Sequence, residues 1–295
     1  MTDSGAGTAR TFADKWSRNP SLAFEQTLDE RSEISRWILR RNGFGSGEGL
    51  AAYLADKGRI LDAGCGNGRV TALLRRYAPD GSELVAVDLH AAEVARENLA
   101  DLPNVSIHRG DLLGDLSELG SFDFIYCQEV LHHTGDPQAA LENLASLLSP
   151  GGEIAIYVYR RKAPVREFTD DYLRERLSAL PYEQAMEVCR NIAELGRALA
   201  DLKTTVRVPA IEPLEIEEGE YDVQRLLYHF FMKCFWNDEL DVEANAAINY
   251  DWYHPDVSSR HTLDEVKSWF AAADLEVVHE YTDPYGITMR GSRRD

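Results

Sequence analysis

The sequence predicts an α/β fold: a doubly wound, mostly parallel sheet that ends in an antiparallel hairpin and carries a helical insertion after the fifth strand. Short apolar strands alternate with helical segments over residues 57–159, which is typical of a parallel sheet covered by helices on both faces. Two C-terminal strands are joined by the short turn 282–285, so they must be antiparallel. Four domains are therefore predicted: an N-terminal helical segment (1–56), the α/β core (57–159), the helical insertion (160–260) and a helix and hairpin that complete the core (261–295).

Hydrophobic spacing predicts the following elements in chain order. Before the core, helices are expected over 12–16, 29–41 and 50–55, with a glycine-rich break at 43–49. The core strands are expected at 59–63, 84–88, 105–109, 122–127 and 151–158, and the core helices at 70–77, 91–100 and 137–148. The insertion is expected to contain helices without strands, over 166–180, 182–203 and 221–236. A helix at 263–273 and strands at 276–281 and 286–290 close the chain.

A glycine-rich loop follows the first core strand and leads into a helix. It contains Gly64, Gly66 and Gly68, preceded by Asp62. Glycine adopts φ > 0 and lets a ligand approach the backbone, and the following helix offers N–H groups to an anion. A dinucleotide fingerprint would need a small residue where Arg69 stands, and a plain turn seldom needs three glycines. The run resembles the first motif of the class I S-adenosylmethionine (SAM)-dependent methyltransferases, in which this loop holds the methionine end of the cofactor.

Acidic residues follow the next two strands. Asp88 can accept both ribose hydroxyls of a nucleoside, because open α/β sheets bind ligands at the carboxyl ends of their strands; a helix N-cap is the alternative. The resemblance implies that Asp111 binds the adenine amino group and that Leu112 donates its backbone N–H. For Asp111, a simple exposed acid is the alternative. Leu89, next to Asp88, is assigned to the same cofactor site.

The fourth strand and the N-terminal segment supply the other cofactor candidates. Cys127 and Gln128 end the fourth strand, and the family placement puts them beside the sulfonium. In these methyltransferases a segment before the core often folds over the cofactor, which implies that Phe12 and Trp16 lie near SAM. The alternative is that both aromatic residues only pin a helix to the core.

Three candidate catalytic residues follow the fourth strand. Glu129, His132 and His133 lie in a run that resembles the family's post-strand motif, where Leu-His-His is frequent. An imidazole that titrates near neutrality can take the proton released when an oxygen or nitrogen is methylated. The alternative is that these histidines mark the fold by bonding backbone groups.

The insertion carries two further catalytic candidates, Tyr253 and His254. They lie in an aromatic-rich part of the sequence, where some side chains are expected to line a cavity and others to pack. His229 and His261 are the other polar residues expected to meet a substrate from this side. The histidines show no recurring short spacing, so no metal site is expected.

Composition and charge limit the kinds of molecule that the protein is expected to bind. The formal net charge of -19 would repel a phosphate backbone, so a nucleic-acid substrate is not expected. The four cysteines form no C-x-x-C pair, which indicates neither a zinc site nor a disulfide framework. There is no apolar run of membrane-spanning length and no apolar signal core at the N-terminus. A cytoplasmic protein is expected.

These features predict SAM-dependent methyl transfer to an oxygen, nitrogen or carbon of a small, partly apolar metabolite. The cofactor half is similar to the ubiquinone and menaquinone methyltransferase group. The alternatives are a non-catalytic protein that binds SAM or a nucleoside and a nicotinamide-dependent oxidoreductase. The insertion is expected to be a lid that selects the substrate and excludes water; a homodimer interface is the other role that suits apolar helices of this length.

Overall fold

The computed structural model describes residues 6–294, which fall into two compact units. The α/β unit contains residues 16–160 and 259–294. The insertion unit contains residues 161–258 together with 6–15. None of the described helices is long and apolar enough to cross a membrane.

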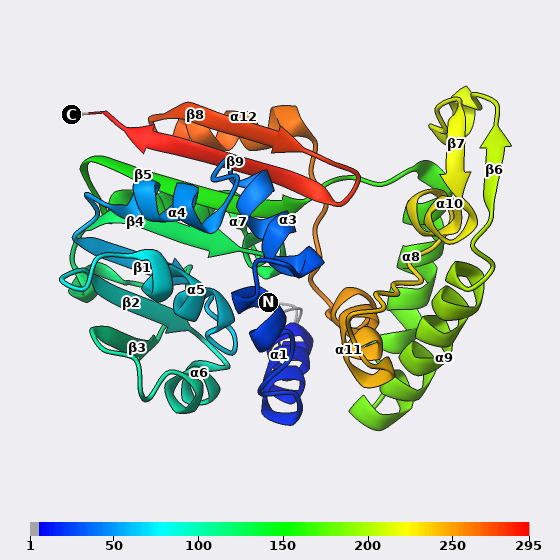
Figure 1. The fold of residues 1–295 in the computed structure, drawn as a ribbon, viewed down its shortest axis with the longest axis horizontal. Helices are drawn as coiled ribbons and strands as arrows, with labels where there is room; N and C mark the ends of the chain where they lie inside the picture. The colour runs from blue at the N-terminus through cyan, green and yellow to red at the C-terminus, as the bar shows by residue number, and fades with distance from the viewer. Residues whose placement is uncertain (1–5, 295) are drawn as a thin grey trace. The chain divides into compact units, whose positions relative to one another are not determined.

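The α/β unit is built on a sheet whose described strands run in the order β3-β2-β1-β4-β5-β9-β8 (Figure 1). Strands β1 to β5 pair in parallel, whereas β9 pairs antiparallel with both β5 and β8. This confirms the predicted fold class, including the terminal hairpin. The strands are β1 (Arg59–Ala63), β2 (Glu83–Asp88), β3 (Val105–Arg109), β4 (Phe122–Gln128), β5 (Leu148–Tyr159), β8 (Leu275–Thr282) and β9 (Gly286–Arg293).

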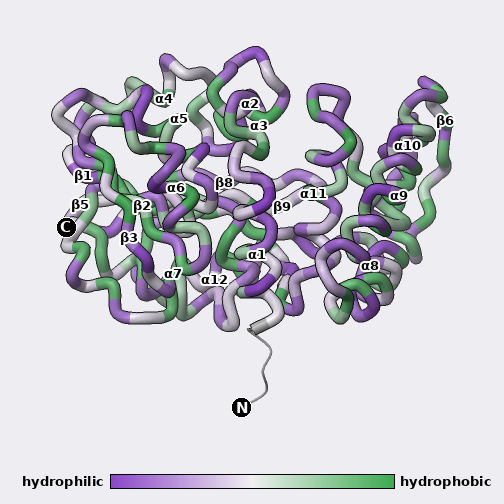
Figure 2. The backbone as a smooth tube through the Cα atoms, turned by 90° about the horizontal axis from the view of Figure 1, so that it is seen from below, coloured by the Kyte–Doolittle hydropathy of each residue, from purple (hydrophilic) through white to green (hydrophobic). Residues whose placement is uncertain are grey.

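Helices cover both faces of this sheet. Neighbouring residues such as Ile60 and Leu61 on β1 point to opposite faces, and neither is exposed to solvent. Ile60 packs in the core with α3 (Glu33–Arg41), α4 (Gly47–Leu54) and α5 (Arg69–Tyr77). Leu61 packs in the core with α7 (Pro137–Ser146) and α12 (Leu263–Ala272). Burial on both faces explains why four consecutive residues of β2, 84–87, are apolar (Figure 2).

Element boundaries before the core differ from the prediction. The helix expected over 12–16 runs from Ala6 to Arg18, and α2 (Phe24–Leu28) was not predicted. The helix expected over 29–41 begins only at Glu33, as α3, because Ser32 caps it by accepting the Ser35 N–H. The glycine-rich break is shorter than expected, since Ser46 accepts the Gly49 N–H and starts α4 at Gly47. The other described helix of the core, α6, runs from Ala92 to Asn98, close to its predicted range.

The insertion unit contains α8 (Pro164–Leu177), α9 (Tyr182–Ala200), α10 (Val223–Phe230) and α11 (Val242–Tyr253). It also contains an antiparallel pair, β6 (Thr205–Val208) with β7 (Gly219–Asp222). The expectation of helices without strands is therefore wrong. None of the residues in these two strands is fully buried, so the pair lacks the apolar face by which a strand is recognised in sequence.

The helix expected over 221–236 ends at Phe230. Beyond it the chain is held by side chains of α11: the Asn249 Oδ1 atom accepts the Phe235 N–H at 2.9 Å, and the Asn245 Oδ1 atom accepts the Asn237 N–H at 2.8 Å. Both asparagines are fully buried. Because α11 is buried on nearly all sides, it has no amphipathic spacing and no helix is predicted there.

The first described residues pack within the insertion unit. Helix α1 (Ala6–Arg18) begins there. The Thr11 Oγ1 atom lies 2.6 Å from the His254 Nδ1 atom, the Thr8 hydroxyl accepts the Val257 N–H at 2.8 Å, and Lys15 forms an ion pair of 2.9 Å with Asp251. The sequence predicts residues 1–56 as one segment. In the structure, residues 6–15 belong to the compact insertion unit and residues 16–56 to the α/β unit.

Candidate functional site

The glycine loop after β1 is confined to glycine by backbone conformation and by packing. Gly64, Gly66 and Gly68 have φ values of 78°, 55° and 86°, all left-handed. A Cβ atom added at Gly64 would lie 2.4 Å from a methyl group of Val130, and one at Gly68 would lie 2.7 Å from a methyl group of Leu99. Larger residues would therefore distort the loop and its surroundings.

The loop is tied to the end of β2. The backbone N–H groups of Gly64 and Cys65 both donate to the Val87 carbonyl, at 2.7 and 3.1 Å. The Gly66 N–H donates to the Asp88 Oδ2 atom at 2.9 Å. Trp16 packs against the other side of Gly66, since a Cβ atom there would lie 2.9 Å from the Trp16 ring. The structure thus brings together Asp88, Trp16 and the glycine loop.

Asp88 also has the capping role considered as an alternative. Its Oδ1 atom accepts the N–H groups of His90 and Ala91, at 2.8 and 2.7 Å, at the start of α6. Within the described part of the chain, the Oδ2 atom accepts the Gly66 N–H. A carboxylate oxygen offers about two lone pairs, so Oδ2 keeps capacity for a hydroxyl donor, and the two roles are compatible.

Asp62 lies below the loop on β1, with 3% of its surface exposed. Burial raises its pKa to about 7, while the Thr71 hydroxyl, which donates to the Asp62 Oδ2 atom at 2.6 Å, acts in the opposite direction. The negative charge of Asp88 raises the pKa further. Asp62 therefore braces β1 against α5 and has little surface from which to reach a ligand.

The residues assigned to the adenine end lie after β2 and β3. Asp111 is exposed and accepts the Leu113 N–H at 3.0 Å. The Leu112 side chain is buried in the core, which leaves its backbone as the group able to meet a ligand. The Leu89 side chain is 40% exposed and follows Asp88 directly.

At the end of β4, the candidates differ in what they can offer. The Cys127 side chain is fully buried in the core, and burial raises the pKa of its thiol well above the ordinary range. The Gln128 Oε1 atom accepts the Tyr126 hydroxyl, whereas its buried Nε2 atom has no hydrogen-bond partner among residues 6–294. Glu129 has a φ of 57° and forms an ion pair of 3.2 Å with Arg69. Of these side chains, Gln128 therefore has N–H donors available for a further hydrogen bond.

The two adjacent histidines differ in exposure. His132 has no exposed surface, and its ring stacks on Tyr159 with 3.6 Å between ring centroids. Its backbone carbonyl accepts the Ser259 N–H at 2.8 Å. His133 is partly exposed and its ring lies 4.3 Å from that of His132. Of the two, His133 is better placed to exchange a proton with a bound molecule.

No sequence signal singles out Arg41, a cation beside the β4 and β5 ends. It has no exposed surface, and its guanidinium lies 3.7 Å from the ring centroid of Trp37 and 4.0 Å from that of Tyr157. Its three guanidinium nitrogens have no hydrogen-bond partner of good geometry within the described part of the chain, although the guanidinium is close enough to the Tyr126 hydroxyl to oppose the rise in the Tyr126 pKa that burial causes. In sequence it is one more basic residue in the last turn of a helix, where basic residues are ordinary.

Strand register places two further unsatisfied polar groups beside Tyr157. Gln128 pairs with Tyr157 across β4 and β5, and Tyr157 pairs with Thr288 across β5 and β9, so all three share one face of the sheet. The Thr288 Oγ1 atom is buried and, like the Gln128 Nε2 atom, has no partner among the residues described. Arg41, Gln128 and Thr288 form a buried polar set at this edge.

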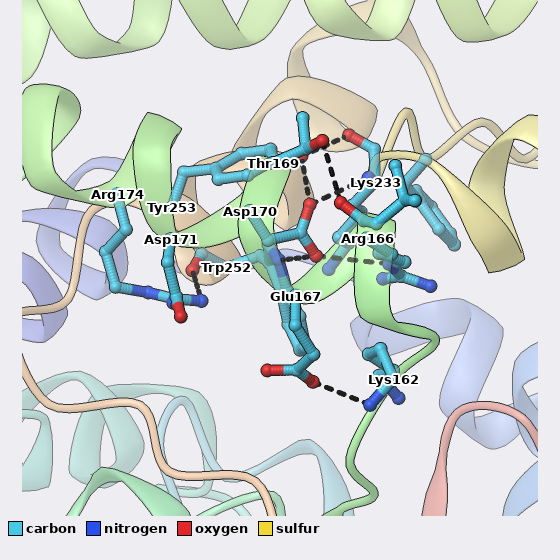
Figure 3. Close-up of polar contacts among 12 residues, drawn as sticks. Lys162, Arg166, Glu167, Thr169, Asp170, Asp171, Arg174, Lys233, Trp252 and Tyr253 are labelled. Carbon is cyan, nitrogen blue, oxygen red and sulfur yellow. Dashed lines mark hydrogen bonds and ion pairs between the residues drawn. The ribbon is translucent and has the colours of Figure 1, made fainter. Parts of the chain in front are cut away.

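The two catalytic candidates of the insertion unit are engaged in internal hydrogen bonds. The Tyr253 hydroxyl lies 2.9 Å from the Asp170 Oδ1 atom (Figure 3), and burial followed by the Asp170 charge raises its pKa well above the ordinary range. The His254 Nδ1 atom contacts Thr11 and its Nε2 atom lies 3.0 Å from the Leu180 carbonyl. Burial lowers the pKa of His254. These contacts favour structural roles for both.

His261 contacts neighbouring side chains, and the cysteines are buried. The His261 Nε2 atom lies 2.8 Å from the Ser259 hydroxyl, and its ring meets Trp269 at 4.5 Å. Cys65, Cys127, Cys189 and Cys234 are buried free thiols. Within the described ranges, no group of three or more His, Cys, Asp or Glu side chains is arranged to hold a metal ion.

The central part of the chain is similar in sequence to known methyltransferases. Residues 61–154 match the methyltransferase domain family. An uncharacterised protein of Synechococcus is 41% identical over 123 residues, which are 38% of this chain and 28% of the relative. The ubiquinone biosynthesis O-methyltransferase of Xanthomonas axonopodis is 34% identical over 119 residues, which are 39% of this chain and 48% of the relative. The chain thus spans less than half the length of either relative.

Among solved structures, an O-methyltransferase family protein from Burkholderia thailandensis resembles this chain with a TM-score of 0.48 and 15% identity, over 96% of this chain and 69% of that one. The resemblance to the class I methyltransferases is confirmed by the domain match and by the sheet topology.

Proposed function

Since residues 61–154 form a methyltransferase domain, we propose that this protein transfers the methyl group of SAM to a small metabolite. The observation that carries the proposal is the loop of three left-handed glycines bonded to Asp88 at the end of β2. Arg69 fills the position where a dinucleotide motif needs a small residue, and its side chain is fixed by Thr27 at 2.8 Å and Glu129. This arrangement favours SAM over a nicotinamide cofactor.

The cofactor is SAM, and each of its parts has a proposed partner. Asp88 would accept the ribose hydroxyls, with Leu89 as its neighbour in the chain, and Asp111 and the Leu112 N–H would hold the adenine. The glycine loop, together with Asp62 and Trp16, would hold the methionine end. Gln128 and Cys127 would lie beside the sulfonium.

The methionine carboxylate of SAM needs a cation, and we assign Arg41 to it. Asp62 pairs with Tyr126 across β1 and β4, so the glycine loop leaves β1 beside Gln128. Gln128 is in turn the neighbour of Tyr157, on whose ring the Arg41 guanidinium lies. A buried guanidinium without an anion is destabilising, and a carboxylate would satisfy its free N–H groups bidentately.

Methyl transfer depends mainly on positioning and on exclusion of water. The acceptor atom must lie in line with the S–CH₃ bond, about 3 Å from the methyl carbon, and a sulfonium that becomes a neutral thioether reacts faster in a dry site. An oxygen or nitrogen acceptor releases a proton. Among the catalytic candidates we assign this proton to His133, because it is more exposed than His132 and because Glu129 is paired with Arg69.

The acceptor atom is an oxygen, nitrogen or carbon of a small, partly apolar molecule, and we propose that the insertion unit selects it. The relative named for ubiquinone biosynthesis supports an oxygen acceptor, although its match is limited to the cofactor half. Substrate selection by Tyr253 and His254 is disfavoured by their internal hydrogen bonds. We also propose that the protein is cytoplasmic, that it does not act on nucleic acid and that it forms a homodimer through the insertion.

Calorimetric titration of the full chain with SAM, S-adenosylhomocysteine and NAD separates the cofactor classes. We expect both adenosyl sulfur compounds to bind and NAD to bind at least ten-fold more weakly. Tighter binding of NAD would contradict the proposal. Formation of S-adenosylhomocysteine from SAM when a metabolite extract is added then distinguishes an enzyme from a protein that only binds SAM.

A further inference from the structure

A buried carboxylate organises the insertion unit. Asp170, on α8, is 1% exposed and accepts four donors (Figure 3). Its Oδ2 atom lies 3.1 Å from the Arg166 Nε atom and 2.8 Å from the Trp252 Nε1 atom, and its Oδ1 atom accepts the Tyr253 hydroxyl at 2.9 Å and the Lys233 N–H at 3.1 Å. Three N–H donors and the Tyr253 hydroxyl, which also lies 2.8 Å from the Lys233 carbonyl, surround the roughly four acceptor sites of this carboxylate. Asp170 therefore has no capacity for a further N–H group.

Arg166 keeps donor capacity that Asp170 cannot satisfy. The residue is 1% exposed, and only its Nε atom is bonded to Asp170, while its Nη1 atom has no hydrogen-bond partner among residues 6–294. Burial on its own lowers the pKa of Arg166, but the charge of Asp170, the neighbouring Tyr228 and Tyr253 and the hydrogen bond to Asp170 together raise it. The guanidinium is therefore charged, buried and incompletely bonded, a state that is unfavourable without a further acceptor.

A second guanidinium lies near the same aromatic ring. Arg225, on α10, also has a buried Nη1 atom without a partner in the described chain. The guanidinium carbons of Arg166 and Arg225 lie 4.5 and 5.6 Å from the ring centroid of Tyr228, within cation–π distance. One aromatic ring thus gathers two cations from different helices. Like charges gathered in this way repel each other unless an anion lies between them.

The pKa of the neighbouring His229 is lowered by burial and by the same positive charges. Burial and then the charges of Arg166, Arg225 and Lys162 lower its pKa to about 3. The imidazole is therefore neutral at physiological pH and adds no charge. This concentration of cations stands in a chain of formal net charge -19.

We propose that Arg166 and Arg225 bind an oxyanion, a carboxylate or a phosphate, within the insertion unit. The anion site does not depend on the proposed function. Each guanidinium group offers a pair of parallel N–H donors that matches either oxyanion. The molecule that binds here is then an acid.

Arg225 is the residue to change, because Arg166 also holds Asp170 and its loss would disturb the fold. The full chain is titrated calorimetrically with sodium benzoate and separately with inorganic phosphate, in the wild type, Arg225→Met and Arg225→Lys. Arg190→Met is the matched control, since Arg190 forms an exposed ion pair with Glu243 on other helices of the same unit. SAM affinity is measured on every variant.

We expect an anion to bind the wild type and the control equally, and Arg225→Met to bind it at least ten-fold more weakly, with Arg225→Lys between them. The probe that binds more tightly shows whether the site prefers a carboxylate or a phosphate. Bound anion should also raise the pKa of His229, observed by NMR, because it offsets the charges of Arg166 and Arg225.

Two results would overturn the anion site: neither probe binds the wild type, or Arg225→Met binds as tightly as the wild type and the His229 pKa does not move. Either would mean that the two arginines only pack on Tyr228. A wild type that binds the anion but not SAM would overturn the proposed function and leave the anion site standing.

Discussion

The Asp88 carboxylate accepts the backbone N–H of Gly66 at 2.9 Å, which joins the end of β2 to the middle of the glycine loop. The same side chain caps α6 through its other oxygen. A single residue therefore shapes the loop and places a negative charge where the ribose of a nucleoside would lie.

Replacing Asp88 with Ala should weaken SAM binding by about 1.5–3 kcal/mol, because a charge-assisted acceptor is lost. Asp88→Asn keeps an oxygen for the Gly66 N–H but loses the charge, so its affinity should lie between the two. Asp115→Ala is the control, since Asp115 is exposed and caps a separate turn through Ser117. Calorimetry measures the affinities; equal SAM binding by wild type and Asp88→Ala would mean that Asp88 is only a cap.

Gly66→Ala should lower both stability and SAM affinity. The left-handed backbone alone disfavours a side chain by roughly 1–2 kcal/mol, and the new methyl group would meet the Trp16 ring at 2.9 Å. Gly45→Ala separates these effects, because Gly45 has a φ of 77° and no atom within 4 Å of an added Cβ. Thermal unfolding and SAM titration of both variants should show a stability loss in each and an affinity loss only at Gly66. Equal SAM affinity in both would remove the loop from the cofactor site.

Stability should fall as pH rises from about 4 to about 7, through Asp62. Its pKa is about 7 in the folded protein and about 3.9 in an unfolded chain. The folded state therefore binds more protons in this window, and the stabilisation present below pH 4 is lost by pH 7, on the order of 4 kcal/mol in all. Urea unfolding at pH 5 and pH 7.5 measures the change, and Asp62→Asn, which stays neutral, should reduce it. An equal change in the two proteins would show that Asp62 does not titrate in this range.

Arg41→Met tests the assignment of Arg41 to the cofactor carboxylate. The wild type should bind S-adenosylhomocysteine at least ten-fold more tightly than methylthioadenosine, which lacks the amino-acid part. Met fills a similar volume without charge, so the variant should lose most of this preference and stay folded. If the preference is unchanged while melting temperature drops, Arg41 only packs between Trp37 and Tyr157.

The fold was predictable because its signals are local. The strand, the three glycines and the helix start lie within twenty residues, and each glycine is required by its own φ value. The C-terminal hairpin follows from the shortness of its turn. The alternation of strands and helices then leaves one common class of sheet.

The parts that were not predictable depend on packing between distant residues. Arg41 acquires its environment from Tyr157, and Arg166 from Asp170 and Tyr228; in sequence each is an ordinary basic residue on a helix. The β6 and β7 pair has no buried face to reveal it. Tyr253 and His254 have the composition of a substrate site, but their polar atoms are taken by Asp170, Thr11 and Leu180.

Methyl transfer from SAM to a small molecule is measured with methyl-labelled SAM and a fractionated metabolite extract. We expect label to enter a small product in equal amount to the S-adenosylhomocysteine formed, and Asp88→Ala to slow this transfer at limiting SAM. Tight SAM binding with no labelled product and no S-adenosylhomocysteine from any fraction would contradict the proposed function.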